Sequence, residues 1–168
     1  MADDLAARLI EISEIHGDFV LSAGQRSKIY FDKFRFLTDP GLLDEVSDAV
    51  IERLPGGVTH IAAPEGAATL LLGALGLKLK LPMAMVRKKR KKYGTQSLVE
   101  GHAPVGARVA LVEDVATTGH QTLAAARALE EEGATIEIIV LTIDRGGADE
   151  LRDAGYDVES IASIRPLD

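Results

Sequence analysis

Hydrophobic positions along the chain follow two periods that alternate. Residues 3–15 and 39–54 place apolar side chains at about every third or fourth position, which predicts amphipathic helices. Residues 106–115 and 135–144 contain short, nearly continuous apolar runs, as expected for strands that are covered on both faces. Segments of the two kinds follow one another along most of the chain, and this order predicts helices that connect the strands of one sheet.

The boundaries of the expected elements follow from this pattern. Helices are expected at 3–15, 39–54, 66–79, 120–134 and 147–155, and strands at 57–64, 81–88, 106–115, 135–144 and 157–164. Residues 19–36 should form two extended pieces around a Ser-Ala-Gly turn, and 87–104 a long irregular connection of the kind that often forms a lid. The alternation predicts right-handed crossovers and an α/β fold with a mostly parallel sheet.

Composition narrows the class of protein. A chain of 168 residues is long enough for one domain with a real core, which we expect to span 1–168. The absence of cysteine excludes a disulfide framework and thiolate chemistry. A net charge of -7 argues against general binding of nucleic acid, and no apolar run is long enough to span a membrane. The acidic, amphipathic start is unlike a signal peptide, so we expect a cytoplasmic protein without a membrane partner.

The most informative segment is LVEDVATTGHQT, residues 111–122. An apolar strand leads to two adjacent acids, Glu113 and Asp114, and then to a loop of small residues before a helix. Backbone N–H groups and the dipole at a helix start favour a phosphate, whereas carboxylates accept hydrogen bonds from sugar hydroxyls. The ligand that this combination predicts is a sugar phosphate. An isolated Glu-Asp pair would instead be typical of an ordinary solvated turn.

The whole motif resembles the phosphoribosyl-diphosphate (PRPP) signature of the type I phosphoribosyltransferases, and the resemblance covers about residues 17–165. It implies a central, mostly parallel sheet flanked by helices, with an N-terminal helix and base-binding hood at 1–40 and a PRPP-binding core at 41–168. It also implies that Glu113 and Asp114 hold the ribose hydroxyls and act in catalysis. The 5′-phosphate would lie in the loop of Val115, Ala116, Thr117, Thr118, Gly119, His120 and Gln121.

Three further segments resemble the orotate phosphoribosyltransferases, which make orotidine 5′-phosphate in pyrimidine (UMP) biosynthesis. Thr117 stands where purine enzymes usually have Asp or Ala. The basic run VRKKRKKYGT (86–95) resembles their catalytic lid, in which Arg87, Lys88, Lys91 and Tyr93 would meet the diphosphate and Lys91 would act in catalysis. Arg145, at the end of the next strand, would bind the orotate carboxylate with its planar fork, while Tyr30 and Phe31 would pack on the orotate ring.

The chain departs from the family pattern at three places. Tyr93 replaces a frequent His of the lid, and Ser22 replaces a Lys that some members have before the hairpin glycine; Lys28 is a candidate substitute for that cation. Pro64 and Glu65 replace a Tyr-Lys pair in the segment that corresponds to the diphosphate loop. These differences bear on the choice of base more than on the binding of PRPP.

The resemblance also implies Mg²⁺ as cofactor and a homodimer whose lid is shared between subunits. The metal would be held by the substrate and water, so no protein ligand is assigned. Two alternatives stay open at this point: a phosphoribosyltransferase for a purine such as xanthine or guanine, and a regulator that senses PRPP or a nucleotide without catalysis. Thr117 and Arg145 argue against the first, and the lid cations Lys88 and Lys91 argue against the second.

Overall fold

The computed structural model describes residues 2–20, 24, 26–90, 97–101 and 105–164. Its helices are α1 (Ala2–Ser13), α2 (Phe34–Leu37), α3 (Pro40–Ile51), α4 (Ala68–Leu79), α5 (His120–Glu131) and α6 (Gly147–Asp153). Its strands are β1 (Glu14–Val20), β2 (Arg26–Phe31), β3 (His60–Pro64), β4 (Met83–Val86), β5 (Val99–Gly101), β6 (Arg108–Ala116), β7 (Thr135–Asp144) and β8 (Val158–Ser163).

The central sheet has the order β5-β4-β3-β6-β7-β8 within the described residues. Its strands are parallel except β5, which pairs antiparallel with β4. The expected α/β fold is therefore confirmed. Because parallel strands end at the same edge, the carboxyl ends of β3, β6 and β7 lie together, and this edge is where such sheets bind ligands.

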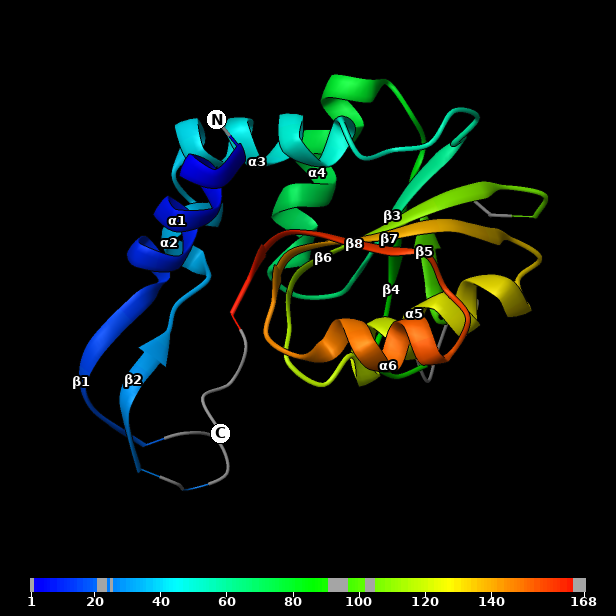
Figure 1. The fold of residues 1–168 in the computed structure, drawn as a ribbon. Helices are drawn as coiled ribbons and strands as arrows, with labels where there is room; N and C mark the ends of the chain where they lie inside the picture. The colour runs from blue at the N-terminus through cyan, green and yellow to red at the C-terminus, as the bar shows by residue number, and fades with distance from the viewer. Residues whose placement is uncertain (1, 21–23, 25, 91–96, 102–104, 165–168) are drawn as a thin grey trace.

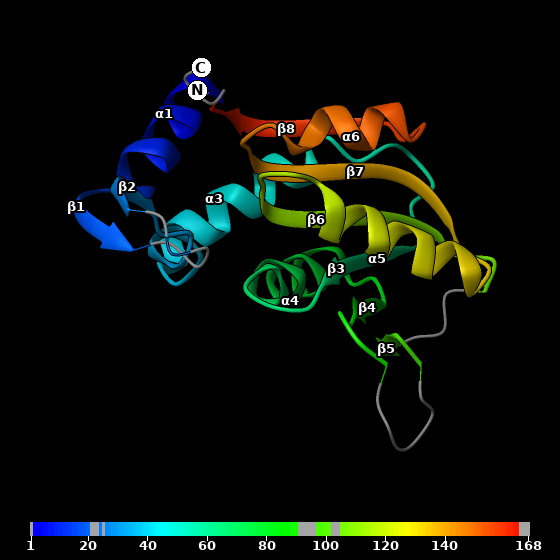
Figure 2. The same ribbon diagram turned by 90° about the horizontal axis from the view of Figure 1, so that it is seen from below.

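Helices cover both faces of this sheet, as Figures 1 and 2 show. On one face, α1, α3 and α4 bury the side chains of Leu9, Val46 and Leu71. On the other face, α5 and α6 bury Leu129 and Leu151. Residues 109–112 of β6 are completely buried between the two layers, which explains why this strand has no polar face before its acids.

The hairpin β1–β2 forms a separate antiparallel pair beside the sheet, below α1 and α2 in Figure 1. The N–H of Asp32 donates to the carbonyl of Ser13 over 2.8 Å and so joins the end of the hairpin to the end of α1. After β2 the chain turns through α2. Its Phe36 is completely buried in the same hydrophobic cluster as Leu9, Val46 and Leu71. The hairpin and α2 are thereby held next to the carboxyl edge of the sheet.

The local signals at helix α3 are confirmed. Asp39 is its N-cap, and its side-chain Oδ1 accepts a hydrogen bond from the N–H of Leu42 over 2.9 Å. Pro40 occupies the first helical position, where its missing N–H costs nothing. Among the described residues, none of the helices is both long enough and apolar enough to cross a membrane.

Several expected boundaries differ from the structure; for example, the helix expected at 3–15 ends at Ser13, and Glu14 begins β1. Residues 34–37 form the helix α2 instead of continuing the extended hairpin. Within the region expected to be irregular, Val99–Gly101 forms β5, so the basic segment connects two strands of a hairpin. The strand β6 continues to Ala116, two residues beyond the acids, because it pairs with β7 as far as Asp144. Glu113 and Asp114 therefore lie inside the strand.

Candidate active site

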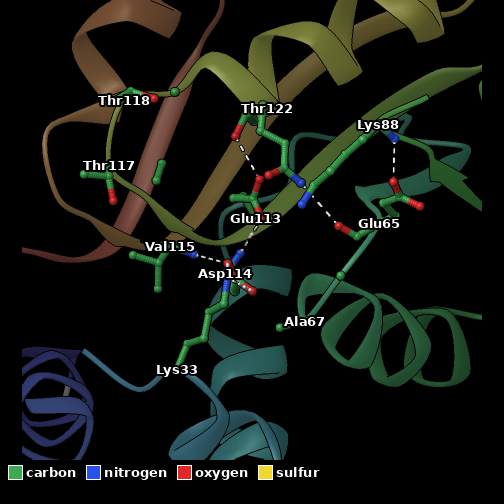
Figure 3. A pocket seen from close by; sticks show the side chains of 14 residues that line it. Lys33, Glu65, Ala67, Lys88, Glu113, Asp114, Val115, Thr117, Thr118 and Thr122 are labelled. Atoms are coloured by element: carbon green, nitrogen blue, oxygen red, sulfur yellow. Dashed lines mark hydrogen bonds and ion pairs between the residues drawn. The ribbon is translucent and has the colours of Figure 1, made fainter. Parts of the chain in front are cut away.

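A cavity of about 230 Å³ lies at the carboxyl edge of the sheet. Figure 3 shows its lining, which comes from segments far apart in the sequence. The chain after β2, the β3–α4 loop and the start of the basic segment contribute Lys33, Glu65 and Lys88, respectively. The end of β6 and the loop into α5 contribute the remainder, which includes Glu113, Asp114, Val115, Ala116, Thr117, Thr118, Gly119, Gln121 and Thr122.

Glu113 is held at the floor of the cavity by buried groups. Its Oε2 accepts a hydrogen bond from the Thr122 hydroxyl over 3.0 Å, and its Oε1 accepts one from the Asp114 N–H over 3.2 Å. Burial, with the neighbouring charge of Asp114 as the second cause, raises the pKa of Glu113 to about 8. The bond from Thr122 opposes this shift without overcoming it. Glu113 is therefore mostly neutral at pH 7.

Asp114 is also buried, and it has a cation beside it. Its side chain is 2% exposed, and the Lys33 ammonium lies 3.2 Å from each carboxylate oxygen. Oδ1 accepts hydrogen bonds from Lys33 and from the Val115 N–H, the latter over 2.5 Å. Oδ2 is buried and accepts no hydrogen bond from the described residues, and the Lys33 ammonium is the charged group beside it. The two adjacent acids thus have different partners, a hydroxyl and an amide at Glu113 and a cation at Asp114.

The loop between β6 and α5 has the geometry of an anion site. Gly119 adopts φ +78°, and a Cβ added there would lie 2.5 Å from the Gly147 carbonyl oxygen. Only glycine fits this approach of two backbones. The N-cap residue of α5 is Gly119, which has no side chain to cap the helix, and Thr117, Thr118 and Gly119 line the cavity at this helix start. The positive end of the helix dipole favours an anion at this position.

His120 points away from this loop. Its Nε2 lies 3.1 Å from Glu150 Oε2 on α6, and its side chain is 74% exposed. The backbone of His120 begins α5, and its N–H lies 3.4 Å from Thr118 Oγ1. A contact of His120 with a phosphate in the loop would therefore use the main chain.

Glu65 and Lys88 form the opposite end of the cavity, as Figure 3 shows. Glu65 Oε1 accepts a hydrogen bond from the Lys88 N–H over 2.7 Å, and its Oε2 lies 4.0 Å from Arg87 Nη2. The Gln121 side chain donates to the Glu65 carbonyl over 3.2 Å, which ties this loop to α5. Arg87 lies beside the cavity, where it lines an apolar hollow together with His120.

The expected base-binding residues divide into two groups. The Arg145 guanidinium lies 4.9 Å from the centre of the Phe31 ring, so the end of β7 and the hairpin meet at this point. Tyr30 instead packs on Phe19, with ring centres 5.5 Å apart, and it is 44% exposed. Consecutive residues of a strand point to opposite faces, which explains why Tyr30 and Phe31 do not share one surface.

Several expectations concern residues outside the described part of the chain. Lys91, Tyr93 and Ser22 belong to this group, so their expected roles stay predictions. Lys28, the candidate substitute cation, forms an ion pair with Asp18 on the exposed hairpin. It is Lys33, not considered from the sequence, that reaches the acids.

Sequence reasoning missed two functional contacts of the acids, those of Lys33 and Thr122. Lys33 is 81 residues from Asp114, and nothing in the local sequence distinguishes it from a surface lysine. Thr122 could have been found, because it lies in the first turn of α5 and is the last residue of the motif at 111–122. A buried hydroxyl at that position can reach back to the strand that precedes the helix.

The acids of the cavity do not make up a metal site of their own among the described residues. The described residues contain no group of three His, Asp or Glu side chains that could hold an ion. Asp114 and Glu113 are occupied by Lys33 and Thr122, respectively. This arrangement fits a divalent ion that arrives with a phosphorylated ligand and keeps its water, and it does not fit an all-protein cage.

Comparison with known proteins agrees with a cavity suited to a sugar phosphate. The family model described as phosphoribosyl transferase domain matches residues 40–165. The orotate phosphoribosyltransferase of Methanopyrus kandleri is 42% identical, with 97% of this chain and 90% of that protein covered. The one of Methanothermobacter thermautotrophicus is 37% identical, with 96% and 93% covered. The crystal structure of the orotate phosphoribosyltransferase from Aeropyrum pernix matches with a TM-score of 0.80 at 33% identity, covering 95% of this chain and 93% of that one.

Proposed function

The chain belongs to the phosphoribosyl transferase family, and from this we propose that it is an orotate phosphoribosyltransferase. The reaction transfers the 5-phosphoribosyl group from PRPP to orotate and gives orotidine 5′-phosphate and diphosphate. The observation that carries the proposal is the cavity at the carboxyl edge of the sheet. The loop before α5, the two acids of β6, and an end lined by Lys88 and Glu65 follow one another along it. Relatives of this name align over nearly the whole chain, which supports orotate as the base.

The lining of the cavity supports one orientation for PRPP. The 5′-phosphate belongs in the loop Thr117–Gly119, where amides, hydroxyls and the dipole of α5 favour an anion. The ribose belongs above Glu113 and Asp114, which line the cavity and would accept hydrogen bonds from its hydroxyls after the Lys33 ammonium has moved aside. The diphosphate then lies at the end formed by Glu65 and Lys88. Each part of the ligand meets a group of suitable charge except at Glu65.

Catalysis in this arrangement needs no protein nucleophile. The bond from ribose C1 to the diphosphate breaks while the nitrogen of orotate approaches, and positive charge develops on the sugar. Asp114 is positioned to stabilise that charge, since its neighbour Glu113 is mostly neutral and Lys33 is the group that can move. Lys33 is 39% exposed at its side chain, whereas Asp114 is fixed inside β6. Positioning and electrostatics therefore supply the rate enhancement.

Orotate is proposed to bind between the end of β7 and the hairpin. Arg145 would bind its carboxylate as a planar, bidentate donor, and Phe31 would contact the ring. Thr117, which lines the cavity, would donate to the base. Tyr30 would reach the base only after a rearrangement of the hairpin, because its ring now packs on Phe19.

Several assignments complete the proposal. Mg²⁺ would be held by the oxygens of PRPP and by water, and it would neutralise the diphosphate as this leaves. Arg87, Lys88, Lys91 and Tyr93 would contact that group, with Lys91 acting in catalysis. Residues 1–40 would form the hood and 41–168 the PRPP-binding core of a single cytoplasmic domain that forms a homodimer.

A screen of bases tests the function directly. The protein is incubated with PRPP, Mg²⁺ and orotate, uracil, guanine, hypoxanthine, xanthine or adenine, and the nucleotide formed is measured. We expect turnover with orotate alone. Turnover with xanthine or guanine would establish the purine alternative, and binding of PRPP without turnover of any base would establish the regulator. The variant Asp114→Asn is the control: it should fold and lose well over tenfold in kcat with the accepted base.

A further inference from the structure

Glu65 is the one acid of the cavity that the proposed chemistry does not use. Its carboxylate contacts the two groups that begin the basic segment: the N–H of Lys88 at 2.7 Å and the guanidinium of Arg87 at 4.0 Å. The Arg87 Nε is buried and has no hydrogen-bond partner among the described residues. Donors that suit an anion therefore surround Glu65, and an internal carboxylate now occupies part of that position.

The same position is where the diphosphate has to lie, an argument that rests on the proposed function. With the 5′-phosphate at the start of α5 and the ribose on the acids of β6, the remaining lining is Glu65, Gly66, Ala67 and Lys88. The backbone of Gly66, at φ +121°, has open space around it, so a ligand can approach this loop closely. A ligand with several negative charges would then meet a fixed negative charge of the protein.

We propose that Glu65 is an internal anion that occupies the diphosphate end of the empty site and weakens the binding of every ligand that carries a diphosphate. When PRPP or diphosphate binds, its oxygens take the donors of Lys88 and Arg87, and the Glu65 side chain turns away. Its side chain is 28% exposed and ends a flexible arm, so this movement needs no change of the fold. Glu65 is thus a specificity-determining residue and not a catalytic one.

This arrangement has a consequence for turnover. A like charge a few ångströms from the diphosphate raises the dissociation rate of the product as well as that of PRPP. The ligands that lack a diphosphate, ribose 5-phosphate and orotidine 5′-phosphate, do not reach Glu65 and do not experience this repulsion. The effect should therefore separate the ligands by chemical group and not by overall charge or size.

Calorimetric titration of Glu65→Gln tests the proposal. The amide keeps an oxygen that can accept from the Lys88 N–H, so the loop is preserved while the charge is removed. At a fixed concentration of Mg²⁺, we expect Glu65→Gln to bind diphosphate and PRPP about tenfold more tightly than the unchanged protein. Ribose 5-phosphate should bind within about twofold, and inhibition by product diphosphate should strengthen by the same factor as its affinity.

Two further variants serve as comparisons. Glu137→Gln removes one charge from the opposite part of the molecule, where Glu137 pairs with Arg108 over 2.9 Å, and it should leave all three affinities unchanged. Glu65→Ala removes the charge and also the acceptor, and it should tighten diphosphate binding in the same direction. A melting temperature measured for each variant verifies that the protein is folded.

Three results would overturn the proposal. Unchanged or weaker binding of diphosphate by Glu65→Gln would show that the carboxylate supports the site, for example through the water of bound Mg²⁺. Equal tightening of ribose 5-phosphate would show a general charge effect without a local contact. Tightening in Glu65→Gln but weakening in a folded Glu65→Ala would assign the effect to the loop. If the unchanged protein binds no PRPP at all, the proposed function fails instead.

Discussion

At the scale of single residues, the site gives its two adjacent acids, Glu113 and Asp114, different surroundings. Glu113 is mostly neutral because it is buried next to Asp114, and Asp114 has Lys33 at 3.2 Å. Removing Lys33 would leave Asp114 as a buried carboxylate without a counter-ion, which is costly. The Lys33 ammonium, which lines the proposed ribose site, thus stabilises the buried Asp114 carboxylate. When the substrate binds, its hydroxyls would replace the Lys33 ammonium as the hydrogen-bond donors of Asp114.

Arg145→Ala should weaken the binding of orotate selectively. A bidentate, charged pair at this position is worth about 2–4 kcal/mol, so KM for orotate should rise by about thirty- to a thousandfold, with a much smaller change for PRPP. Steady-state kinetics with each substrate varied in turn measures both constants. Arg127→Ala, an exposed arginine on α5, is the matched control. Equal changes in both Michaelis constants would remove Arg145 from the orotate site.

The raised pKa of Glu113 predicts how stability depends on pH. In the folded protein the pKa of Glu113 is about 8, whereas its ordinary value, expected in the unfolded chain, is 4.5. The folded state therefore binds more protons between these values, and the free energy of unfolding contributed by Glu113 falls as the pH rises through this window. At about 1.4 kcal/mol per pKa unit, the loss is at most about 5 kcal/mol.

Urea unfolding of the unchanged protein and of Glu113→Gln at pH 5 and pH 8 measures this loss. Glutamine does not titrate, so the difference in the free energy of unfolding between the two proteins should shift in favour of the variant on going from pH 5 to pH 8. A difference that is the same at both pH values would mean that Glu113 is ionised in the folded protein.

At the scale of elements, the loop between β6 and α5 depends on its contact with α6. Gly119 lies against the backbone of Gly147, and a Cβ at Gly147 would itself lie 2.8 Å from the Gly119 nitrogen. The Arg145 N–H donates to the Ala116 carbonyl over 2.8 Å, which joins the same two loops. The proposed phosphate site and the proposed orotate site are therefore parts of one rigid edge. A change in either loop should affect both substrates.

Gly119→Ala should disturb this edge by two effects. Alanine is strained at φ +78°, and its Cβ would meet the Gly147 carbonyl at 2.5 Å. We expect a loss of about 2–4 kcal/mol in the free energy of unfolding and at least tenfold weaker binding of PRPP. Gly155→Ala is the control, because it has φ +95° and open space, so it should cost about 1 kcal/mol from strain alone. Chemical denaturation and calorimetry measure the two effects, and equal losses in both variants would contradict the close approach.

At the scale of the whole molecule, the segment proposed as the hood contacts the carboxyl edge of the sheet through Phe31 and Lys33. Phe31 contacts Arg145, and Lys33 contacts Asp114, so both residues of the hood segment reach across to the core. The hairpin itself stands beside the sheet and away from α5 and α6, as Figure 2 shows. The basic segment leaves the sheet from the other end of the strand order, between β4 and β5. It begins at the cavity through Lys88, and its Lys91 is proposed to serve the site of the other subunit in the dimer.

Mixing two inactive variants tests this shared site. Chains with Lys91→Ala are combined with chains with Asp114→Ala, so that random pairing makes about half of the dimers hybrid. If Lys91 and Asp114 of one site come from different subunits, each hybrid has one site with both substitutions and one with neither. Activity should then recover to roughly a quarter of that of the unchanged protein. No recovery, with hybrid dimers shown by native mass spectrometry, would place Lys91 in its own chain's site. The control replaces Lys91→Ala by Lys28→Ala. The Lys28→Ala chain should be active by itself, because Lys28 pairs with Asp18 on the exposed hairpin.

The order of elements and the chemistry of the main motif could be predicted from the sequence, because both depend on local patterns. Apolar periods determine which segments become helices or strands, and an acid pair followed by a small-residue loop is contiguous in the chain. The short β5 was missed, since three residues paired with β4 have too little pattern of their own. The same reason explains α2, whose four residues are helical because Phe36 packs into the core.

Only the tertiary structure decided the electrostatics of the site. Lys33 meets Asp114 across 81 residues of chain, and that contact depends on where the hairpin and α2 pack. The neutral state of Glu113 depends on its burial, and the division between Tyr30 and Phe31 on which face of β2 turns to the sheet. Charge and burial are properties of all neighbours in space together, so a linear pattern names the acids but does not tell which one keeps its proton.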